Sequence, residues 1–307
     1  MCNNPDHHHG EEAPHIAILN RRKVMHSIAA GGAIAAAPAL SSCATNPETG
    51  RKQFTGLAPG MNQMGQMAAA SWSEMKQKIP TSTDPRYTSR LRNIGGRIAR
   101  GAGRADQSWD YAVFDKDTKN AFVMPGNRVG FYKGMMDFTD NDDQIAGIMG
   151  HEVGHVTGEH ARERFSMQMA QQVAVAGTAI VGGSQLSKKC KKAQTREAYN
   201  SCMRNAQRNT QYMVQAIGLG SMIGLVLPYS RKHETESDLL GANYMHRAGY
   251  DPYQSVKLWE KMAANNPRRQ PEFLSTHPDP SNRAKTLHDY IKRQEALGSQ
   301  GFKNIQT

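Results

Sequence analysis

The sequence feature that most limits what this chain can fold into is the pentapeptide His151-Glu152-Val153-Gly154-His155. On an α-helix, positions 151 and 155 lie one turn apart on the same face, so two imidazoles can bind one metal ion while Glu152 lies beside it. Imidazole and carboxylate groups are ligands that zinc prefers. The pattern therefore predicts a helix with His151 and His155 bound to zinc.

The residues before this pentapeptide predict the helix itself. Residues 140–143 (Asp-Asn-Asp-Asp) provide an N-cap and acidic side chains for the first turn. Apolar residues follow at helical spacing at Ile145, Ile148 and Met149. We therefore expect a buried helix over about residues 141–165.

A third ligand is expected from the charged segment 229–238. Its Glu234 and Asp238 lie one helical turn apart and can point at the same site. Glu234 would leave the fourth position for water, as catalytic zinc does, and Asp238 can accept a hydrogen bond from the outer nitrogen of His151. One Zn²⁺ per chain is the expected cofactor, although cobalt or manganese can replace zinc in vitro. The other histidines of this half are expected on exposed helix faces: His233, His246 and His288.

The remaining periodicities predict a mainly helical α+β fold. Two helices are expected over residues 60–102, with the methionine stripe Met61, Met64 and Met67 facing the core. Short β-rich runs within residues 109–132, separated by turn residues, predict a small antiparallel sheet beside the ligand helix. Further helices are expected at 167–181, 213–227, 252–264 and 281–297.

The first 42 residues have the anatomy of an export signal. The basic run 21–23 precedes about 15 weakly apolar residues, too few for a spanning helix. The segment Leu-Ser-Ser-Cys that ends at Cys43 is similar to the lipobox of bacterial lipoproteins, and the paired arginines also resemble a twin-arginine signal. We expect residues 1–42 to be removed, Cys43 to carry a lipid and residues 43–59 to form an irregular tether.

The net charge of +11 comes from 38 Lys and Arg against 27 Asp and Glu. Residues 1–42 hold three of each sign, so their removal leaves 35 minus 24, again +11. The basic residues are dispersed apart from a cluster at residues 188–192, and no aromatic residues alternate with them, which argues against nucleic-acid binding. Outside the cytoplasm, anionic lipid head groups or acidic unfolded segments are the expected partners.

Cys190 and Cys202 are the cysteines expected within the folded domain. An oxidising compartment favours a disulfide between them, which would fasten the basic segment at about residues 182–211. Two free thiols are the alternative.

The two motifs together resemble a known family. Residues 151–155 and 230–238 (SRKHETESD) are similar to the HExxH and SRxxExEAD signatures of the HtpX-like, Oma-like and CaaX-prenyl-protease-like zinc metallopeptidases, the gluzincins of metallopeptidase family forty-eight, and in particular of its periplasmic lipoprotein members. The resemblance implies a zincin-like metallopeptidase domain over residues 60–307. It extends to three further segments: 43–53 (CATNPETGRKQ), 120–126 (NAFVMPG) and 275–278 (STHP).

By position, the resemblance assigns the chemistry to residues of this chain. Glu152 would be the general base that activates a zinc-bound water and passes the proton to the leaving amine. The other roles fall on His151, His155 and Glu234 as zinc ligands and on Asp238 as the hydrogen-bond partner behind them.

The resemblance also adds residues near the C-terminus. In relatives, the histidine that matches His277 can occupy the fourth zinc position and restrain activity, and Arg283 lies near the site. We expect Arg283, His277 or Tyr244 to stabilise the oxyanion.

The implied function is a zinc endopeptidase on the periplasmic side of the cell envelope, acting on misfolded or misassembled proteins. Residues 126–131 are expected to offer a strand edge to which an extended substrate adds by main-chain hydrogen bonds. The residues expected at this edge are Gly126 and Val129, together with Asn120 earlier in the chain. The alternative is a basic envelope chaperone or adaptor with a structural or latent zinc site. Glu152 favours the enzyme, because a structural site needs no base.

Overall fold

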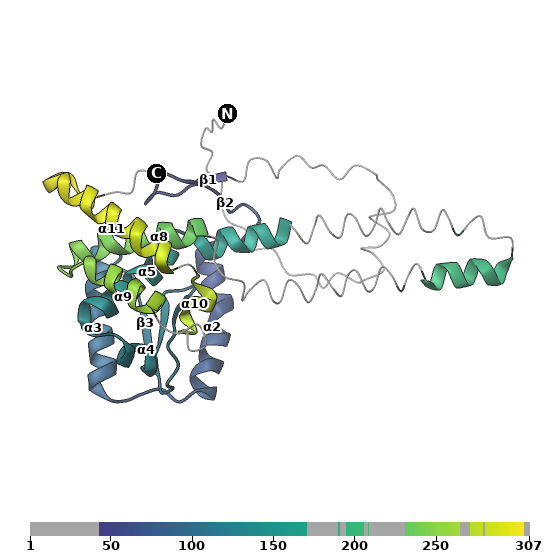
Figure 1. The fold of residues 1–307 in the computed structure, drawn as a ribbon. Coiled ribbons are helices and arrows are strands. Elements are labelled where there is room, and N and C mark those ends of the chain that lie inside the picture. Colours follow the sequence, from purple (N-terminus) through teal and green to yellow (C-terminus); the bar gives the residue numbers. More distant parts are fainter. Residues whose placement is uncertain are drawn as a thin grey trace, which may run out of the picture.

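The computed structural model describes residues 43–170, 190, 195–205, 208, 231–264, 271–278 and 280–303. The expected export signal, most of the helix expected at 167–181, the whole of the one expected at 213–227 and part of the basic segment at about 182–211 lie outside the described residues. The described chain is mainly helical with two small sheets, which confirms the α+β class (Figure 1). None of its helices is long and apolar enough to cross a bilayer.

The first described segment is a hairpin, where the turn-rich sequence predicts an irregular tether. Strands β1 (Cys43–Thr45) and β2 (Lys52–Phe54) pair antiparallel. Asn46 organises the turn, because its side-chain oxygen accepts hydrogen bonds from the backbone N–H groups of Glu48 at 2.9 Å and Thr49 at 3.2 Å. The turn formers thus close a hairpin instead of leaving the chain irregular.

Two helices follow, as the sequence predicts: α2 (Met61–Lys78) and α3 (Pro85–Gly101). Asp84 caps α3 by accepting a hydrogen bond from the backbone N–H of Arg86 at 2.9 Å, and Pro85 suits the first turn because it has no N–H to leave unpaired. Helix α3 packs against β3 of the central sheet and α2 against β4, so the two helices stand on opposite sides of the strands (Figure 1). The buried residues of α3 include Leu91, Ile94 and Ile98.

The central sheet has the strand order β3-β5-β4, with β3 (Asp110–Phe114), β4 (Ala121–Met124) and β5 (Arg128–Tyr132). Strands β4 and β5 are antiparallel but β3 and β5 are parallel, so the sheet is mixed and the prediction of a wholly antiparallel sheet is wrong. The connection after β3 passes over the position next to β3, so that β4 forms the far edge of the sheet. A tight turn with Gly126 and Asn127 at φ of 85° and 57° then brings β5 back into the gap.

The two edges of this sheet differ. Along the outer edge of β3, the N–H of Ser82 donates to the carbonyl of Val113, and the N–H of Asp115 donates to the carbonyl of Pro80, both at 2.8 Å. Among the described residues, no segment pairs with the outer edge of β4. One edge is therefore covered, and the other remains available.

Helix α5 (Asp142–Thr157) carries the His-Glu-Val-Gly-His pentapeptide and is buried along most of its length. Its N-cap is Asn141, whose side chain accepts a hydrogen bond from the N–H of Gln144 at 2.9 Å. The helix is shorter than predicted, because the backbone turns at Glu159, which has a φ of 51°. Residues 160–170 then form a separate helix.

Helix α8 (Arg231–Arg247) lies along α5, and C-terminal helices pack against both (Figure 1). Apolar side chains of α5, α8, α9 and α11 join in one core cluster, in which Ile145, Leu240, Trp259 and Ile291 are buried. The other elements are α4 (Lys133–Phe138), α9 (Tyr253–Ala264), α10 (Phe273–Thr276), α11 (Pro280–Ala296) and the 3-10 turn Gly298–Gln300.

Candidate metal centre

Glycines bring the two ligand-bearing helices into backbone contact. A Cβ on Gly150 of α5 would lie 3.0 Å from the carbonyl oxygen of Gly241 in α8, and one on Gly241 would lie 2.9 Å from the amide nitrogen of His151. Larger residues would push the helices apart. Because the helices touch, Glu234 reaches the histidines of α5.

Four donor side chains, His151, His155, Glu234 and His277, converge on one point, and all four are buried. Nε2 of His151 lies 3.0 Å from Nε2 of His155, and each of these atoms lies 3.5 Å from an oxygen of Glu234. Nδ1 of His277 lies 3.1 Å from Nε2 of His151 and 3.0 Å from Oε2 of Glu234. The four ligand atoms lie within 4.8 Å of one another, as the donors of one metal ion do.

The donors fit zinc in their chemistry as well as their spacing. Burial, with the charges of neighbouring histidines, lowers the pKa of His155 well below its ordinary value, which favours the neutral ring that binds metal. Burial alone would raise the pKa of Glu234, but His277 lowers it, so the carboxylate is ionised. Imidazole nitrogens facing each other across 3.0 Å beside a carboxylate call for a cation, and zinc takes such tetrahedral sets.

Asp238 lies behind His151. Its Oδ1 lies 2.9 Å from Nδ1 of His151, so this ring nitrogen donates the hydrogen bond when Nε2 faces the metal. Arg283 binds both oxygens of the same carboxylate, with Nε 2.7 Å from Oδ2 and Nη2 2.7 Å from Oδ1. Burial alone would raise the pKa of Asp238, but the guanidinium lowers it to about 2, so the group stays ionised.

Two of the three residues expected at the oxyanion lie elsewhere. Arg283 is buried behind the donors, bound to Asp238 and, at 2.9 Å, to Glu234. Tyr244 is buried, and its hydroxyl is hydrogen bonded to the C-terminal end of α5. Of the three, only His277 borders the open groove beside the site. Arg283 therefore lies behind the donors and not at this groove.

Glu152 lies between the donors and this groove. Its carboxyl is buried, and Oε1 makes no hydrogen bond to any described residue, while Nε2 of His277 lies 3.6 Å away. Burial raises the pKa of Glu152, and the charges of His277 and His151 oppose the shift. Most buried carboxylate oxygens accept a hydrogen bond, so Oε1 of Glu152 is an exception among the described residues.

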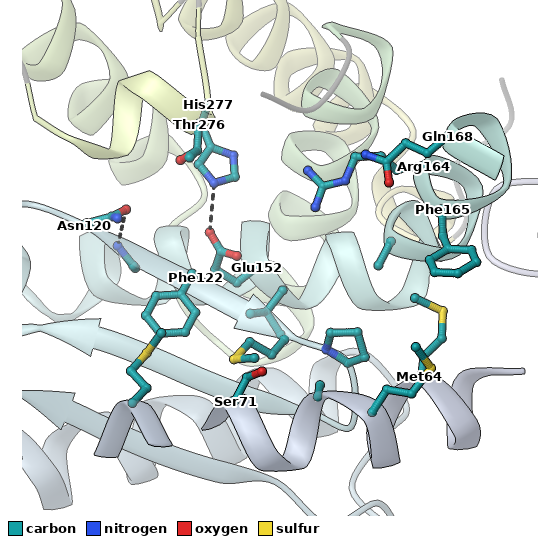
Figure 2. Close-up of a pocket in the computed structure, with 18 of the residues that line it drawn as sticks. Met64, Ser71, Asn120, Phe122, Glu152, Arg164, Phe165, Gln168, Thr276 and His277 are labelled. Carbon is teal, nitrogen blue, oxygen red and sulfur yellow. Dashed lines mark hydrogen bonds and ion pairs between the residues drawn. The ribbon is translucent and has the colours of Figure 1, made fainter. Parts of the chain in front are cut away.

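The groove has a volume of about 620 Å³ (Figure 2). Helix α2 forms its floor, β4 and the helix of residues 160–170 form its walls, and Glu152 and His277 lie opposite α2. Met64 and Met67 of the methionine stripe line this groove, and the stripe does not lie wholly in the core, since Met64 is 8% exposed but Met67 is 57% exposed. Other apolar lining residues are Met75, Phe122, Met124 and Phe165.

The strand expected to receive a substrate is not the one at the groove. Val129 lies on β5, the central strand, and is fully buried. Gly126 lies in the turn between β4 and β5, packed against Gly65 of α2. The groove is bordered by β4 and by Asn120, which directly precedes it. The tight turn thus places β5 behind β4, and the edge belongs to β4.

Two histidines behind the donors differ from what the sequence predicts: His233 is buried where an exposed position is expected, and His160 is not predicted at all. His233, expected on an exposed face, is 5% exposed, and its Nε2 lies 2.9 Å from Oε2 of Glu163. His160 is fully buried, and its Nδ1 lies 2.8 Å from Nδ1 of His155. The sequence signal for His160 is its place five positions after His155, which becomes a contact because the helix breaks at Glu159.

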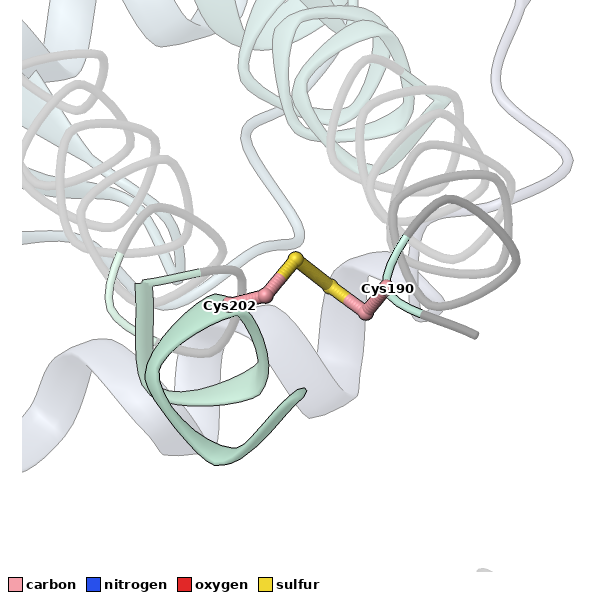
Figure 3. The surroundings of a disulfide bond; sticks show 2 residues. All are labelled: Cys190 and Cys202. Atoms are coloured by element: carbon pink, nitrogen blue, oxygen red, sulfur yellow. A yellow bond between two sulfur atoms is a disulfide. The ribbon is translucent and has the colours of Figure 1, made fainter. Parts of the chain in front are cut away.

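The structure joins Cys190 and Cys202 by a disulfide (Figure 3). Their Cα atoms lie 5.6 Å apart, and the sequence separation is 12 residues. Cys202 belongs to a helix over residues 196–205. The bridge lies within the basic segment, and neither cysteine belongs to the metal donor set.

Residues 85–291 match the profile of peptidase family M48. The chain is 25% identical over 252 residues to Mitochondrial metalloendopeptidase OMA1 of Schizosaccharomyces pombe, an alignment that covers 80% of this chain and 65% of that protein. It is 26% identical over 251 residues to Beta-barrel assembly-enhancing protease of Escherichia coli (strain K12), covering 80% and 47%. The alignment with OMA1 of Saccharomyces cerevisiae, also 26% identical, covers 75% and 63%. The chain thus spans less than two thirds of the length of these relatives.

The family match covers more than half of the chain and includes all four donors, Glu152 and Asp238. It leaves out the hairpin of β1 and β2 and helix α2. The chain therefore belongs to peptidase family M48, the zinc metallopeptidases, and its zinc site is formed by His151, His155, Glu234 and His277.

Proposed function

We propose that the protein is a zinc-dependent endopeptidase of the cell envelope that hydrolyses peptide bonds of misfolded or misassembled proteins. The observation that carries this proposal is Glu152, whose buried Oε1 makes no hydrogen bond among the described residues and which borders a groove beside the zinc donors. A structural zinc site has no use for such a group. The similarity to a metalloendopeptidase and to a second protease supports the same reaction.

The residues of the chain divide the work of peptide hydrolysis. Zinc, when bound, supplies a Lewis acid that polarises the peptide carbonyl and makes water more acidic. Glu152 takes the proton of the attacking water and delivers it to the leaving amine, because its carboxylate borders both the donors and the groove. Asp238 and Arg283 hold His151 in place, so the ring needs no reorientation during the reaction.

The substrate backbone lies along the outer edge of β4 in this proposal. The carbonyl of Asn120 accepts a hydrogen bond from the N–H of Tyr132 at 3.0 Å, so the alternation of an antiparallel pair turns the N–H and C=O groups of Ala121 and Val123 outward. The side-chain oxygen of Asn120 accepts a hydrogen bond from the N–H of Ala121 at 2.9 Å. The outward N–H and C=O groups of Val123 are then the ones that pair with a substrate strand. Because only an extended chain can pair with an edge, unfolded proteins are the expected substrates.

The lining of the groove favours substrates with large apolar side chains near the scissile bond. Met64, Met67 and Phe122 border the space beside Glu152. Methionine is flexible and adapts to apolar groups of different shape. Such groups are buried in folded proteins and exposed in unfolded ones, which fits a role in protein quality control.

His277 restrains the site in this proposal. It completes a four-donor set, an arrangement without an open position for water. The residue follows the short helix α10, and its ring stacks on that of Phe273 at 4.2 Å. A side chain on a short connection can leave the donors without moving α5 or α8, so we expect activity to require that departure.

The envelope location rests on the N-terminal sequence and on one relative. Residues 1–42 have the anatomy of an export signal, and Cys43 follows a segment similar to a lipobox. The relative from Escherichia coli is named for the assembly of β-barrels. A disulfide such as Cys190–Cys202 is typical of oxidising compartments. A lipid surface is therefore the expected partner besides protein substrates, and nucleic acid is not.

A second candidate function is a chaperone or adaptor with a structural or latent zinc site. The four-donor arrangement with His277 favours it, because structural zinc sites are closed. In that case Glu152 would be dispensable.

Zinc content and casein hydrolysis of wild type, Glu152→Gln and Glu260→Gln test the proposal. Glu260 is an exposed carboxylate on α9 and serves as the control. An endopeptidase requires that Glu152→Gln keep its zinc and lose about 10²- to 10⁴-fold in rate, while Glu260→Gln matches wild type. Full activity of Glu152→Gln would contradict the mechanism. If both the wild type and the His277→Ala variant were inactive, the chaperone function would be favoured.

A further inference from the structure

The two zinc-binding histidines of α5 are held from behind in different ways. Nδ1 of His151 meets a carboxylate directly, that of Asp238. Nδ1 of His155 meets another imidazole instead, Nδ1 of His160, at 2.8 Å. His160 is fully buried and lies outside the donor set. The orientation of His155 therefore depends on what holds His160.

The hydrogen bonds around His160 run in one direction. With Nε2 of His155 facing the metal, its Nδ1 carries the hydrogen and donates to Nδ1 of His160. His160 then carries its own hydrogen on Nε2 and donates to Oε2 of Glu236 at 3.0 Å. The hydroxyl oxygen of Ser237 lies 3.2 Å from Nδ1 of His160. His160 thus links the zinc ligand to the carboxylate of Glu236.

Glu236 is in turn fixed by Arg51. Nε of Arg51 donates to Oε2 of Glu236 at 2.7 Å, and Nη1 and Nη2 donate to the two oxygens of Glu163 at 3.0 and 2.7 Å. Arg51 is 7% exposed, so its charge is balanced by these glutamates and little by water. The planar guanidinium binds two carboxylates at once and leaves Glu236 little freedom to turn.

Arg51 comes from the hairpin of β1 and β2, far from the zinc motifs in the sequence. The hairpin is fastened to the end of α5, because Nδ2 of Asn46 donates to the carbonyl of Thr157 at 3.0 Å and Gln53 donates to that of Gly158. Figure 1 shows β1 and β2 beside α8, the helix that carries Glu236. The hairpin therefore delivers the guanidinium to the back of the zinc site.

We propose that Arg51 is a positioning residue of the zinc site, which fixes the ring of His155 through Glu236 and His160. Arg51 thus acts behind His155 as Arg283 acts behind His151. The hairpin of β1 and β2 is then a component of the metal centre and more than a spacer. This inference rests on the zinc site and on no property of the substrate.

Zinc affinity and ligand geometry test this role together. The zinc dissociation constant, from competition with a chelating dye, and the visible absorption of the cobalt-substituted protein are measured for wild type, Arg51→Gln and Arg51→Lys. Arg97→Gln is the matched control, because Arg97 donates to the carbonyl of Ala248 at 2.6 Å and touches no residue of the zinc site. All proteins are the full chain.

We expect Arg51→Gln to weaken zinc binding about 10- to 100-fold, as losses behind a metal ligand do, and to shift the cobalt absorption. Arg51→Lys keeps the charge but not the planar fork, and should recover part of the affinity. Arg97→Gln should match wild type in both measurements.

Thermal unfolding of the zinc-free proteins separates positioning from folding. If Arg51→Gln lowered the midpoint but kept the wild-type zinc affinity and cobalt absorption, the residue would be structural only and the proposal would be wrong. Should Arg51→Gln not fold, the isosteric Glu236→Gln carries the same test: weaker zinc binding supports the proposal, and wild-type binding overturns it. No peptide is needed, so the outcome is independent of the proposed proteolysis.

Discussion

Gly154 of α5 lies directly against Ser237 of α8, so that a Cβ on Gly154 would come 2.8 Å from the carbonyl oxygen of Ser237 and 2.9 Å from its Cα. These two residues lie on the helices that carry the histidines and Glu234. The spacing of the zinc donors therefore depends on the absence of a side chain at position 154.

Gly154→Ala is expected to push α8 away from α5, destabilise the protein by about 1–3 kcal/mol and weaken zinc binding. Urea unfolding of the zinc-free protein and dye competition for zinc measure the two effects. The control is Gly96→Ala on α3, where a Cβ would meet no atom within 4 Å and helix propensity favours alanine. If Gly154→Ala were as stable as Gly96→Ala, α5 and α8 would be able to move apart without a cost in free energy.

Arg283→Gln is expected to cost about 3–5 kcal/mol of unfolding free energy in the zinc-free protein, because it leaves the buried carboxylates of Asp238 and Glu234 without their guanidinium. Urea unfolding measures the loss. Arg86→Gln is the control, since its ion pair with Asp84 is exposed and its removal should have no measurable effect. A small loss for Arg283→Gln would mean that the carboxylates find another partner.

His277→Ala is expected to change activity and metal binding in opposite directions. Loss of one of four donors should weaken zinc binding at least about tenfold, or about 1.4 kcal/mol, while the opened position should raise the rate of casein hydrolysis. His288→Ala, on α11 away from the donors, should change neither. If His277→Ala lost activity with unchanged zinc affinity, His277 would act on the substrate and would not restrain the site.

Acid should remove the contribution of Glu163 to stability. Burial alone would raise its pKa, but hydrogen bonds from His233 and Arg51 lower it to about 2 from the ordinary 4.5. A lowered pKa in the folded state adds stability above pH 4.5, and this contribution is lost as the pH falls toward 2. The difference in unfolding free energy between zinc-free wild type and Glu163→Gln should therefore shrink on acidification.

Urea unfolding between about pH 7 and pH 3 measures this difference. Arg51→Gln removes one of the two partners and should show a flatter pH dependence than wild type. A difference that stayed constant, or grew in acid, would mean that Glu163 is not held ionised by these partners.

Helical spacing explains why the centre of the site could be predicted. His151 and His155 lie on one turn of one helix, and Glu234 and Asp238 on one turn of another, so each pair follows from a 3.6-residue period. The sequence marks the ends of these helices less clearly. The break that ends α5 early falls at Gly158 and Glu159, and a single glycine within a helical pattern is too weak a signal to place the end of a helix.

Long-range pairings explain what could not be predicted. Arg51 and Glu236 are separated by 185 positions, and no periodicity connects them. The insertion of β5 between β3 and β4 likewise depends on how the chain crosses the sheet, which short runs of β-rich sequence do not specify. The strand edge expected around Gly126 and Val129 is therefore absent, because β5 is the central strand, although Asn120 lies at the groove.

The family match begins at Pro85, after the hairpin and α2. A recombinant fragment trimmed to that match would keep every zinc donor. It would lose the floor of the groove and the Arg51 guanidinium that pairs with the buried carboxylates of Glu163 and Glu236. The shortest piece of this chain that could be purified as a complete catalytic unit therefore begins no later than the hairpin.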